Sequence, residues 1–479
     1  MSKSFFWYDF ESTGIDPRRD RPVQVAGVRT NEQLEEIGEP LCIDCQLSDD
    51  VLPNPMACLV TGIGPERVAA GLGEPEFIHR LHQQMMMPGT CSVGYNSLRF
   101  DDEMTRFTLY RNFHDPYARE WQGGNSRWDL LDALRAAHAL RPEGIIWPEQ
   151  DGFISLRLEA LTAANGIDHG QAHDALADVR ATIAMARLLR QAQPRLFDYL
   201  LSLRSKHRVS ELVDLQNARP LVHVSGRFGR ERSGLGLVLP LGWHPTNRNA
   251  LIVYDLAADP ALIMSQPAED IRRLLYTRHD ELAEGEARPG LKLVHINKCP
   301  VLADTKVLLP ADIERLQLDM PQLLQRAEQL AAWRGEAQGV LGQIYAQDAT
   351  ASAIEDPELQ LYGSFIGDVD RRLLPAIREA DGRTLAATQW PLRDQRLVDM
   401  LFRYRARHFA DTLTEPEREK WQQFCRDRLT GVEPGAPITF SDFMQSIEAL
   451  LPQVDMQQQA LLLAWQAEAK ARAQRLGIQ

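Results

Sequence analysis

The pattern of apolar and polar residues changes twice along the chain, and these changes limit the folds that it can adopt. Up to about residue 194, apolar runs that predict strands alternate with segments of helical periodicity, which is typical of an α/β domain. Strand-like runs punctuated by Gly and Pro dominate residues 220–256 and 291–309. Helical periodicity returns at about residue 358. Because 479 residues exceed what one hydrophobic core organises, several domains are required. We expect three, over residues 1–194, 195–350 and 351–479.

The same patterns predict individual elements. We expect strands over residues 5–10, 23–29, 41–47 and 91–95, and helices over 75–87, 102–110 and 175–191. In the second domain we expect a small β-barrel or sheet with one helical excursion around 267–283. Residues 346–357 are small and polar, which is typical of a linker.

The composition is that of an ordinary globular protein, with 44% hydrophobic and 25% charged residues. The sequence has no apolar run near the ~18 residues of a membrane span. Its N-terminus lacks an apolar stretch followed by a cleavage site of small residues. We therefore expect a cytoplasmic protein with no membrane association. The Cys42–Cys45 pair has no second pair of ligands at zinc spacing, so we expect reduced cysteines.

The net charge of −13, taken alone, argues against nucleic-acid binding, because phosphates require local positive potential. The distribution of charge matters more than its total. Residues 203–232 carry seven Lys or Arg against three acids. An acidic protein that binds single strands needs such a local concentration of cations together with stacking rings. The charge therefore leaves nucleic-acid binding open.

An acidic pair occupies the first predicted strand. Asp9 and Glu11 are two positions apart, so both side chains face the same side of the strand. Neighbouring carboxylates repel each other and remain ionised together only if a positive charge lies between them. A divalent cation is the usual solution, because Asp and Glu supply the oxygen ligands that it prefers. Alone, such a pair is weak evidence for a metal site and is more typical of an exposed strand face.

Two further acidic motifs lie at the ends of predicted elements. Asp101 and Asp102 follow the strand at 91–95, where that strand turns into a helix, and sites of α/β domains lie at such ends. A helix-capping role is the alternative for this pair. His173 precedes the long helix, and Asp178 lies near its start. A lone histidine in that position is also compatible with an ordinary surface residue.

Together these motifs resemble the DEDDh class of 3′→5′ exonucleases. The motifs are D-x-E at Asp9 to Glu11, N-x-x-x-F-D at Asn96 to Asp101, and H-x-x-x-x-D at His173 to Asp178. Further segments resemble the bacterial exonuclease I family and extend the resemblance from Trp7 to the final helix. These segments are Trp128–Asp132, Ala139–Gly144, Ser155–Glu159, Pro194–Tyr199, His244–Asn249, His295–Pro300 and Tyr404–His408. The middle residue of the first motif, Phe10, departs slightly from the family but points away from the acids.

The resemblance implies a fold and a catalytic centre. The fold would be a ribonuclease H-like exonuclease domain with a mixed sheet, followed by an SH3-like β-barrel domain and a C-terminal helical domain. Asp9, Glu11, Asp101 and Asp178 would hold two Mg²⁺ ions, with Mn²⁺ as a possible substitute, for phosphodiester hydrolysis. His173 would be the general base. Asp101 is preferred to Asp102 because the family places the ligand directly after the phenylalanine.

The resemblance also implies a substrate and a partner. The chain would degrade single-stranded DNA processively to 5′-mononucleotides, as a monomer, in DNA repair and recombination. The expected strand contacts are Arg106, Tyr117, Trp121, Arg135, Arg157, Tyr199 and Lys206, although Arg157 could instead pair with Glu159. Family members bind the C-terminal tail of single-stranded-DNA-binding protein. Arg403, Arg405 and Arg407 could lie near a pocket for that tail, or could pair with acids of neighbouring helices.

Two other functions share the acidic motifs. A DEDDh ribonuclease or proofreading subunit would have the same five catalytic residues, but such enzymes often need little beyond the nuclease domain. A non-catalytic nucleic-acid-binding module could retain the fold. The presence of all four carboxylates and the histidine argues against this second reading.

Overall fold

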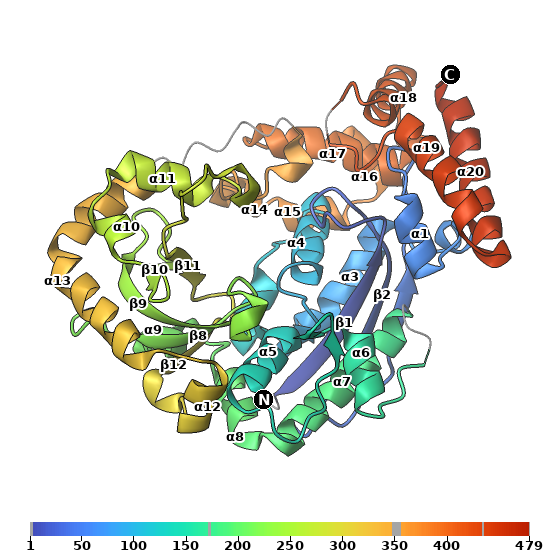
Figure 1. Ribbon diagram of the computed structural model, residues 1–479. Coiled ribbons are helices and arrows are strands. Elements are labelled where there is room, and N and C mark those ends of the chain that lie inside the picture. The colour runs from blue at the N-terminus through green and yellow to red at the C-terminus, as the bar shows by residue number, and fades with distance from the viewer. Residues whose placement is uncertain (1–2, 171–173, 347–355, 434, 479) are drawn as a thin grey trace. The chain divides into compact units, whose positions relative to one another are not determined.

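The computed structural model describes residues 3–170, 174–346, 356–433 and 435–478, and its elements are labelled in Figure 1. Within these residues the chain divides into two compact units. Unit 1 contains residues 1–126, 169–183 and 352–479, and unit 2 contains residues 127–168 and 184–351. The predicted linker at 346–357 lies largely outside the described residues.

A mixed sheet forms the centre of unit 1. The strands of this sheet that lie wholly in unit 1 are β1 (Ser4–Ser12), β2 (Pro22–Thr30), β3 (Leu41–Asp44) and β4 (Thr90–Gly94). They lie in the order β3-β2-β1-β4, with β1 antiparallel to β2 and parallel to β4. These strands confirm four sequence predictions. The third is shorter than expected because Cys45 leaves the ladder and forms an isolated bridge with Leu72.

The alternation of side chains along β1 determines where its acids lie. Phe6, Tyr8 and Phe10 belong to a buried cluster with Phe77 and Leu81 of α3. Because successive side chains of a strand point to opposite faces, Asp9 and Glu11 lie on the face away from this cluster. The helices around the sheet are α1 (Pro55–Thr61), α2 (Pro65–Ala69), α3 (Glu74–Met85), α4 (Asp101–Arg111) and the start of α7 (Ala175–Ala192). The predicted helices at 75–87, 102–110 and 175–191 are thus confirmed.

The C-terminal part of unit 1 is helical, as predicted. Its α-helices are α14 (Asp368–Arg371), α15 (Leu374–Glu379), α16 (Gly382–Ala387), α17 (Gln395–His408), α18 (Glu415–Thr430), α19 (Phe440–Leu450) and α20 (Met456–Leu476). Thr414 and Asp455 begin α18 and α20 with capping boxes, in which side chain and backbone satisfy each other's hydrogen bonds. Left-handed glycines, Gly431 and Gly477, end both helices.

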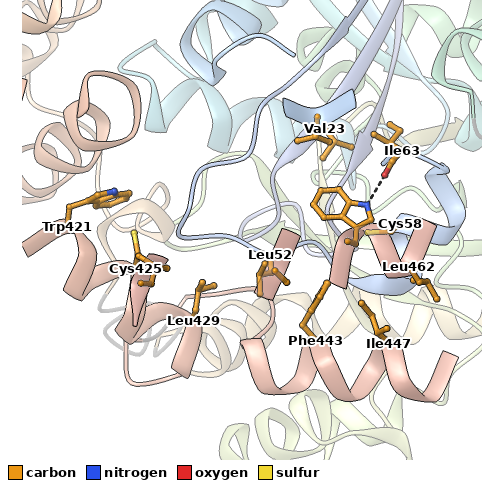
Figure 2. Close-up of a cluster of buried hydrophobic side chains, with 14 of the residues drawn as sticks. Val23, Leu52, Cys58, Ile63, Trp421, Cys425, Leu429, Phe443, Ile447 and Leu462 are labelled. Carbon is orange, nitrogen blue, oxygen red and sulfur yellow. Dashed lines mark hydrogen bonds between the residues drawn. The ribbon is translucent and has the colours of Figure 1, made fainter. Parts of the chain in front are cut away.

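One buried cluster joins the two ends of the sequence. Val23 and Cys58 pack in the same core as Phe443 and Leu462, and Figure 2 shows these side chains pointing toward one another. The indole Nε1 of Trp465 donates a hydrogen bond to the carbonyl oxygen of Ile63 at 2.9 Å. Accordingly, α20 lies beside α1 in Figure 1. The C-terminal helices therefore share a core with residues 23–68.

Arg403, Arg405 and Arg407 of α17 form ion pairs. Their acidic partners are Asp356 for Arg403 (2.7 Å), Glu417 for Arg405, and Asp50 (2.8 Å) and Glu358 (2.6 Å) for Arg407. Arg403 and Arg407 are less than one-tenth exposed. Of the two readings of these arginines, pairing with acids of neighbouring segments is the one that the structure confirms.

Unit 2 carries an antiparallel sheet of order β11-β10-β9-β8-β12. Its strands are β8 (Leu221–Val224), β9 (Leu235–Trp243), β10 (Ala250–Asp255), β11 (Leu291–His295) and β12 (Val301–Asp304). The predicted helical excursion at 267–283 contains α11 (Ala268–Tyr276), and α10 (Ala261–Met264) precedes it between the same two strands. Two further helices, α12 (Pro310–Arg315) and α13 (Met320–Tyr345), follow the sheet and were not predicted. Helix α13 packs against α11 and β9 (Figure 1).

The remaining elements of unit 2 precede this sheet. They are β5 (Ser126–Asp129), α5 (Leu130–Leu140), β6 (Glu149–Gln150), β7 (Phe153–Ile154), α6 (Leu158–Ala164), the end of α7, α8 (Pro194–Ser202) and α9 (Lys206–Glu211). Pro194 occupies the first position of α8, where its missing N–H has no helical acceptor to lose. Among the described residues, no helix is both long enough and apolar enough to cross a membrane.

Candidate active site

Three of the predicted acids converge in unit 1. Asp9 and Glu11 come from β1, and Asp178 comes from the first turn of α7. One carboxylate oxygen from each lies within 4.8 Å of the others. Among the described residues, this is the one group of three acidic, His or Cys side chains that meets that distance. Sequence positions more than 160 residues apart are thereby brought to one point.

Burial and mutual repulsion act on the protons of this cluster. Burial raises the pKa of Asp9 well above its usual range, and the charges of Asp101 and Asp178 raise it further. Burial raises the pKa of Glu11 to about 9, with the charges of Asp9 and Asp178 adding to the effect. The acids therefore resist ionisation as long as no cation accompanies them. Positive charge at this point would remove the repulsion, so the cluster suits a divalent metal with oxygen ligands.

Asp101 and Asp102 have different environments although both begin α4. Asp101 is 3% exposed, and its Oδ1 accepts a hydrogen bond from the backbone N–H of Phe10 at 3.1 Å. That contact places it beside Asp9, whose pKa it raises. Asp102 instead accepts hydrogen bonds from Tyr8 Oη at 2.7 Å and from the Arg119 guanidinium at 2.6 Å. Its charge is neutralised by an arginine, which favours Asp101 as the fourth ligand.

The start of α7 presents Asp178 to the cluster. Asp174 caps the helix, because its Oδ1 accepts hydrogen bonds from the backbone N–H groups of Leu176 and Ala177 at 3.1 Å. Asp178 lies in the first turn, where the helix dipole favours a negative charge. His169 Nε2 lies 2.6 Å from Asp178 Oδ1, a contact that the sequence motifs did not predict. The predicted base, His173, lies outside the described residues.

Three of the residues predicted to contact the DNA strand lie together in unit 1. Arg106 is 5% exposed, and its guanidinium contacts Glu120 and Glu103, each at 2.7 Å. A phosphate at Arg106 would therefore compete with two carboxylates. Tyr117 lies under this guanidinium at 5.4 Å, and Trp121 is 65% exposed. Of the three, Trp121 has the most ring surface open to a base.

The other predicted contacts belong to unit 2. Lys206 is exposed at the start of α9, and Arg135 of α5 is half-buried and paired with Asp132. The Tyr199 hydroxyl donates to the Leu302 carbonyl at 2.7 Å, so its ring edge remains as the contact surface. The Arg157 side chain is 70% exposed and lies 3.7 Å from Glu159. It can therefore pair with Glu159 and still be accessible to a phosphate. Three of the seven cations in 203–232 are ion-paired, namely Arg208, Arg219 and Arg232.

One exposed aromatic residue, Phe365, was not identified from the sequence. Phe365 is 83% exposed, and its ring centroid lies 6.4 Å from that of Tyr117. Both line a small cavity of about 40 Å³ with Leu361 and Leu374. An exposed phenylalanine next to a predicted stacking residue is a candidate contact for a base. No periodicity identifies it, because its partner lies almost 250 residues earlier in the sequence.

Comparison with known families covers nearly the whole chain. Residues 6–186 match a family described as "Exonuclease", residues 204–347 match "Exonuclease I SH3-like domain", and residues 355–471 match "Exonuclease I C-terminal domain". The predicted fold class is thus confirmed: a nuclease domain with a mixed sheet, an SH3-like domain and a helical C-terminal region.

Individual relatives agree over the same length. The chain is 44% identical to exodeoxyribonuclease I of Escherichia coli, over 97% of this chain and 98% of that protein. It is 46% identical to exodeoxyribonuclease I of Haemophilus influenzae, over 89% of this chain and 90% of that protein. The structure of E. coli exonuclease I with a dA16 oligonucleotide matches with a TM-score of 0.93 at 43% identity, covering 98% of this chain and 100% of that one.

Two other similar structures contain further ligands of the relatives. One is a zinc-bound form of an E. coli exonuclease I complex with single-stranded DNA, with a TM-score of 0.93 at 42% identity, covering 99% of this chain and 100% of that one. The other is described as SSB/exonuclease I in complex with the inhibitor CFAM, with a TM-score of 0.91 at 42% identity, covering 98% and 100%. Matching sequence, matching architecture and the buried acidic cluster agree, and the chain belongs to the exonuclease I family.

Proposed function

We propose that this protein hydrolyses single-stranded DNA from the 3′ end and releases 5′-mononucleotides. The observation that carries the proposal is the convergence of Asp9, Glu11 and Asp178 within 4.8 Å, in a chain that matches DNA-bound exonuclease I over almost its full length. Buried carboxylates with raised pKa values are costly to maintain, and such clusters concentrate at functional sites.

In this proposal all four acids are ligands of the cations. Asp9, Glu11 and Asp178 offer converging oxygens, and Asp101 lies next to Asp9, fixed by the backbone N–H of Phe10. Two divalent cations at such a site supply the charge that activates a water and stabilises the leaving oxygen. Mg²⁺ suits an all-oxygen site that retains water, and Mn²⁺ is a plausible substitute. His173 would accept the proton of the attacking water.

Substrate binding and partners extend the proposal. The strand would contact Trp121, Lys206, Arg157 and the ring of Tyr199, while Arg106, Tyr117 and Arg135 would act more through positioning of their neighbours.

We place the functional domains at 1–194, 195–350 and 351–479. The complex of SSB with a relative supports binding of single-stranded-DNA-binding protein through its C-terminal tail. We further propose that the protein degrades DNA processively, in DNA repair and recombination.

One assay tests the reaction. A 5′-labelled single-stranded oligonucleotide is incubated with Mg²⁺ or with a chelator, beside a matched duplex, a matched RNA and an oligonucleotide blocked at its 3′ end. We expect stepwise shortening of the unblocked single-stranded DNA that requires Mg²⁺. Digestion of the 3′-blocked strand would overturn the polarity, and faster cutting of the RNA would favour a ribonuclease. Addition of SSB with and without its C-terminal tail tests the partner, because only the intact protein should bind.

A further inference from the structure

His169 contacts a candidate metal ligand directly. Its Nε2 lies 2.6 Å from Asp178 Oδ1, and the two side chains are 11% and 19% exposed. At that distance and degree of burial the contact is a short hydrogen bond to a carboxylate, stronger than one between neutral groups. His169 lies five residues before the helix cap Asp174 and belongs to the same unit as Asp178.

The geometry leaves Asp178 able to serve two partners. A carboxylate has two oxygens, so one can accept a hydrogen bond from an imidazole while the other binds a cation. The Asp178 side chain can rotate about its own bonds, and the helix fixes only its backbone. A donor on Oδ1 restricts that rotation. In metal sites, a hydrogen bond to a ligating carboxylate orients it and tunes its basicity in this way.

We propose that His169 is a positioning residue for metal binding, whose Nε2–H donates to Asp178 and orients this carboxylate toward Asp9 and Glu11. The proposal rests on the proposed function, in which Asp178 is a metal ligand. His169 orients a ligand, whereas the proposed general base His173 would accept a proton from the attacking water. The role of His169 is therefore in cation affinity rather than in proton transfer.

Two substitutions separate these roles. His169→Leu removes the donor while keeping much of the volume, and His169→Gln keeps an N–H group that can reach Asp178. Loss of an outer partner of a metal ligand typically weakens binding by about 10–100-fold. We therefore expect weaker cation binding in His169→Leu and at least partial recovery in His169→Gln. His79→Leu is the control, because His79 is an exposed histidine of α3 in the same unit.

The experiment measures Mn²⁺ binding to the full-length protein by the EPR signal of the free ion, without DNA, and in parallel the Mg²⁺ concentration that gives half-maximal hydrolysis. We expect both constants to rise about 10–100-fold in His169→Leu, with wild-type values in His79→Leu. Thermal unfolding in chelator verifies that each variant is folded. An unchanged Mn²⁺ affinity in His169→Leu overturns the proposal, and a fall in kcat alone would instead assign proton transfer to His169.

The proposed function fails in a different way. If wild type shows no Mg²⁺-dependent hydrolysis, or if Asp178→Asn binds and cleaves as wild type does, Asp178 is not a ligand. If wild type hydrolyses DNA and Asp178→Asn is inactive, the proposed function stands. The result for His169→Leu then tests only the positioning role.

Discussion

Buried acids of this protein fall into two groups with opposite electrostatics. At Asp9 and Glu11, burial and like charges raise the pKa. At Glu74, burial also opposes ionisation, but the guanidinium groups of Arg111 and Arg21 lower the pKa to about 2. The ion pair of Glu74 with Arg111 supports the fold, whereas the mutual repulsion of Asp9 and Glu11 works against it in the absence of metal. This contrast marks Asp9 and Glu11 as functional residues.

Asp9→Asn should separate activity from stability. The change removes a ligand, and since even an outer partner costs about 10–100-fold, we expect hydrolysis to fall by more than about 100-fold. It also removes one of the charges that repel Glu11, so the free energy of unfolding in chelator should stay equal or rise. Single-turnover hydrolysis and urea unfolding measure the two effects. Glu39→Gln, at an exposed position, should change neither; an active Asp9→Asn enzyme would contradict the assigned site.

The cluster also predicts how stability depends on pH. Glu11 has a folded pKa of about 9 against a usual value of 4.5, so the folded state retains a proton that the unfolded state releases. Its contribution to stability is complete below pH 4.5 and is lost as pH rises through about 9.

Thermal unfolding across this pH range should therefore show a falling Tm in chelator. Saturating Mg²⁺ should reduce the slope, because the cation binds the ionised acids of the folded state. A Tm in chelator that rises between pH 6 and 9 would show that the acids are not held protonated.

Individual residues differed in how far the sequence could assign them. The i, i+2 spacing in β1 was enough to place Asp9 and Glu11 on one face. The sequence distinguishes Asp101 from Asp102 only through the family resemblance. The residue that donates a hydrogen bond to Asp102 is Arg119, which lies on a separate 3₁₀ turn. His169 was missed because a single histidine has no periodicity, and no sequence motif indicates its contact with Asp178.

At the scale of elements, strands and helices were easier to predict than their partners. Apolar periodicity identified β1, β2, β4, α4 and α7, because each has a core-facing pattern of its own. The same periodicity indicated a helix near α20 but could not say that it packs on α1. The 26-residue helix α13 lies between the strand-rich residues 291–309 and the linker predicted at 346–357, and no element was predicted there. Tertiary partners depend on distant segments and leave no local pattern.

The contact of α20 with α1 gives a prediction for one side chain. Trp465 is 2% exposed and donates a hydrogen bond to Ile63. Trp465→Ala leaves a cavity and an unsatisfied carbonyl, and buried aromatic-to-alanine changes cost about 3–5 kcal/mol. Met456→Ala, at an 85% exposed position of the same helix, should change the free energy of unfolding by less than about 0.5 kcal/mol. Urea unfolding followed by fluorescence and by circular dichroism compares them, and equal effects would contradict the packing.

At the scale of the whole molecule, one hydrophobic core contains residues of two domains that are far apart in the sequence. Composition placed a domain start at 351, and the family match to the C-terminal domain begins at 355. The described residues of that segment nevertheless bury side chains with Val23, Leu52 and Ile63. A boundary in sequence is therefore not a boundary in the hydrophobic core.

Truncation before residue 356 should consequently damage folding. Removing residues 356–479 would expose the side chains of Val23, Leu52 and Ile63 and would remove Arg407, an ion-pair partner of Asp50. We expect an aggregated or strongly destabilised fragment, measured by size-exclusion chromatography and thermal unfolding. A fragment that folds with the wild-type Tm would contradict this.

The shared core also sets an order of events during synthesis. Val23, Leu52 and Ile63 leave the ribosome before the residues that cover them, from Trp421 to Trp465, are made. At about 5–20 residues per second, roughly 400 intervening residues take about 20–80 s to translate. During that interval an apolar surface of the nascent chain remains uncovered. The hydrophobic core of the nuclease is thus completed only after Trp465 has been made.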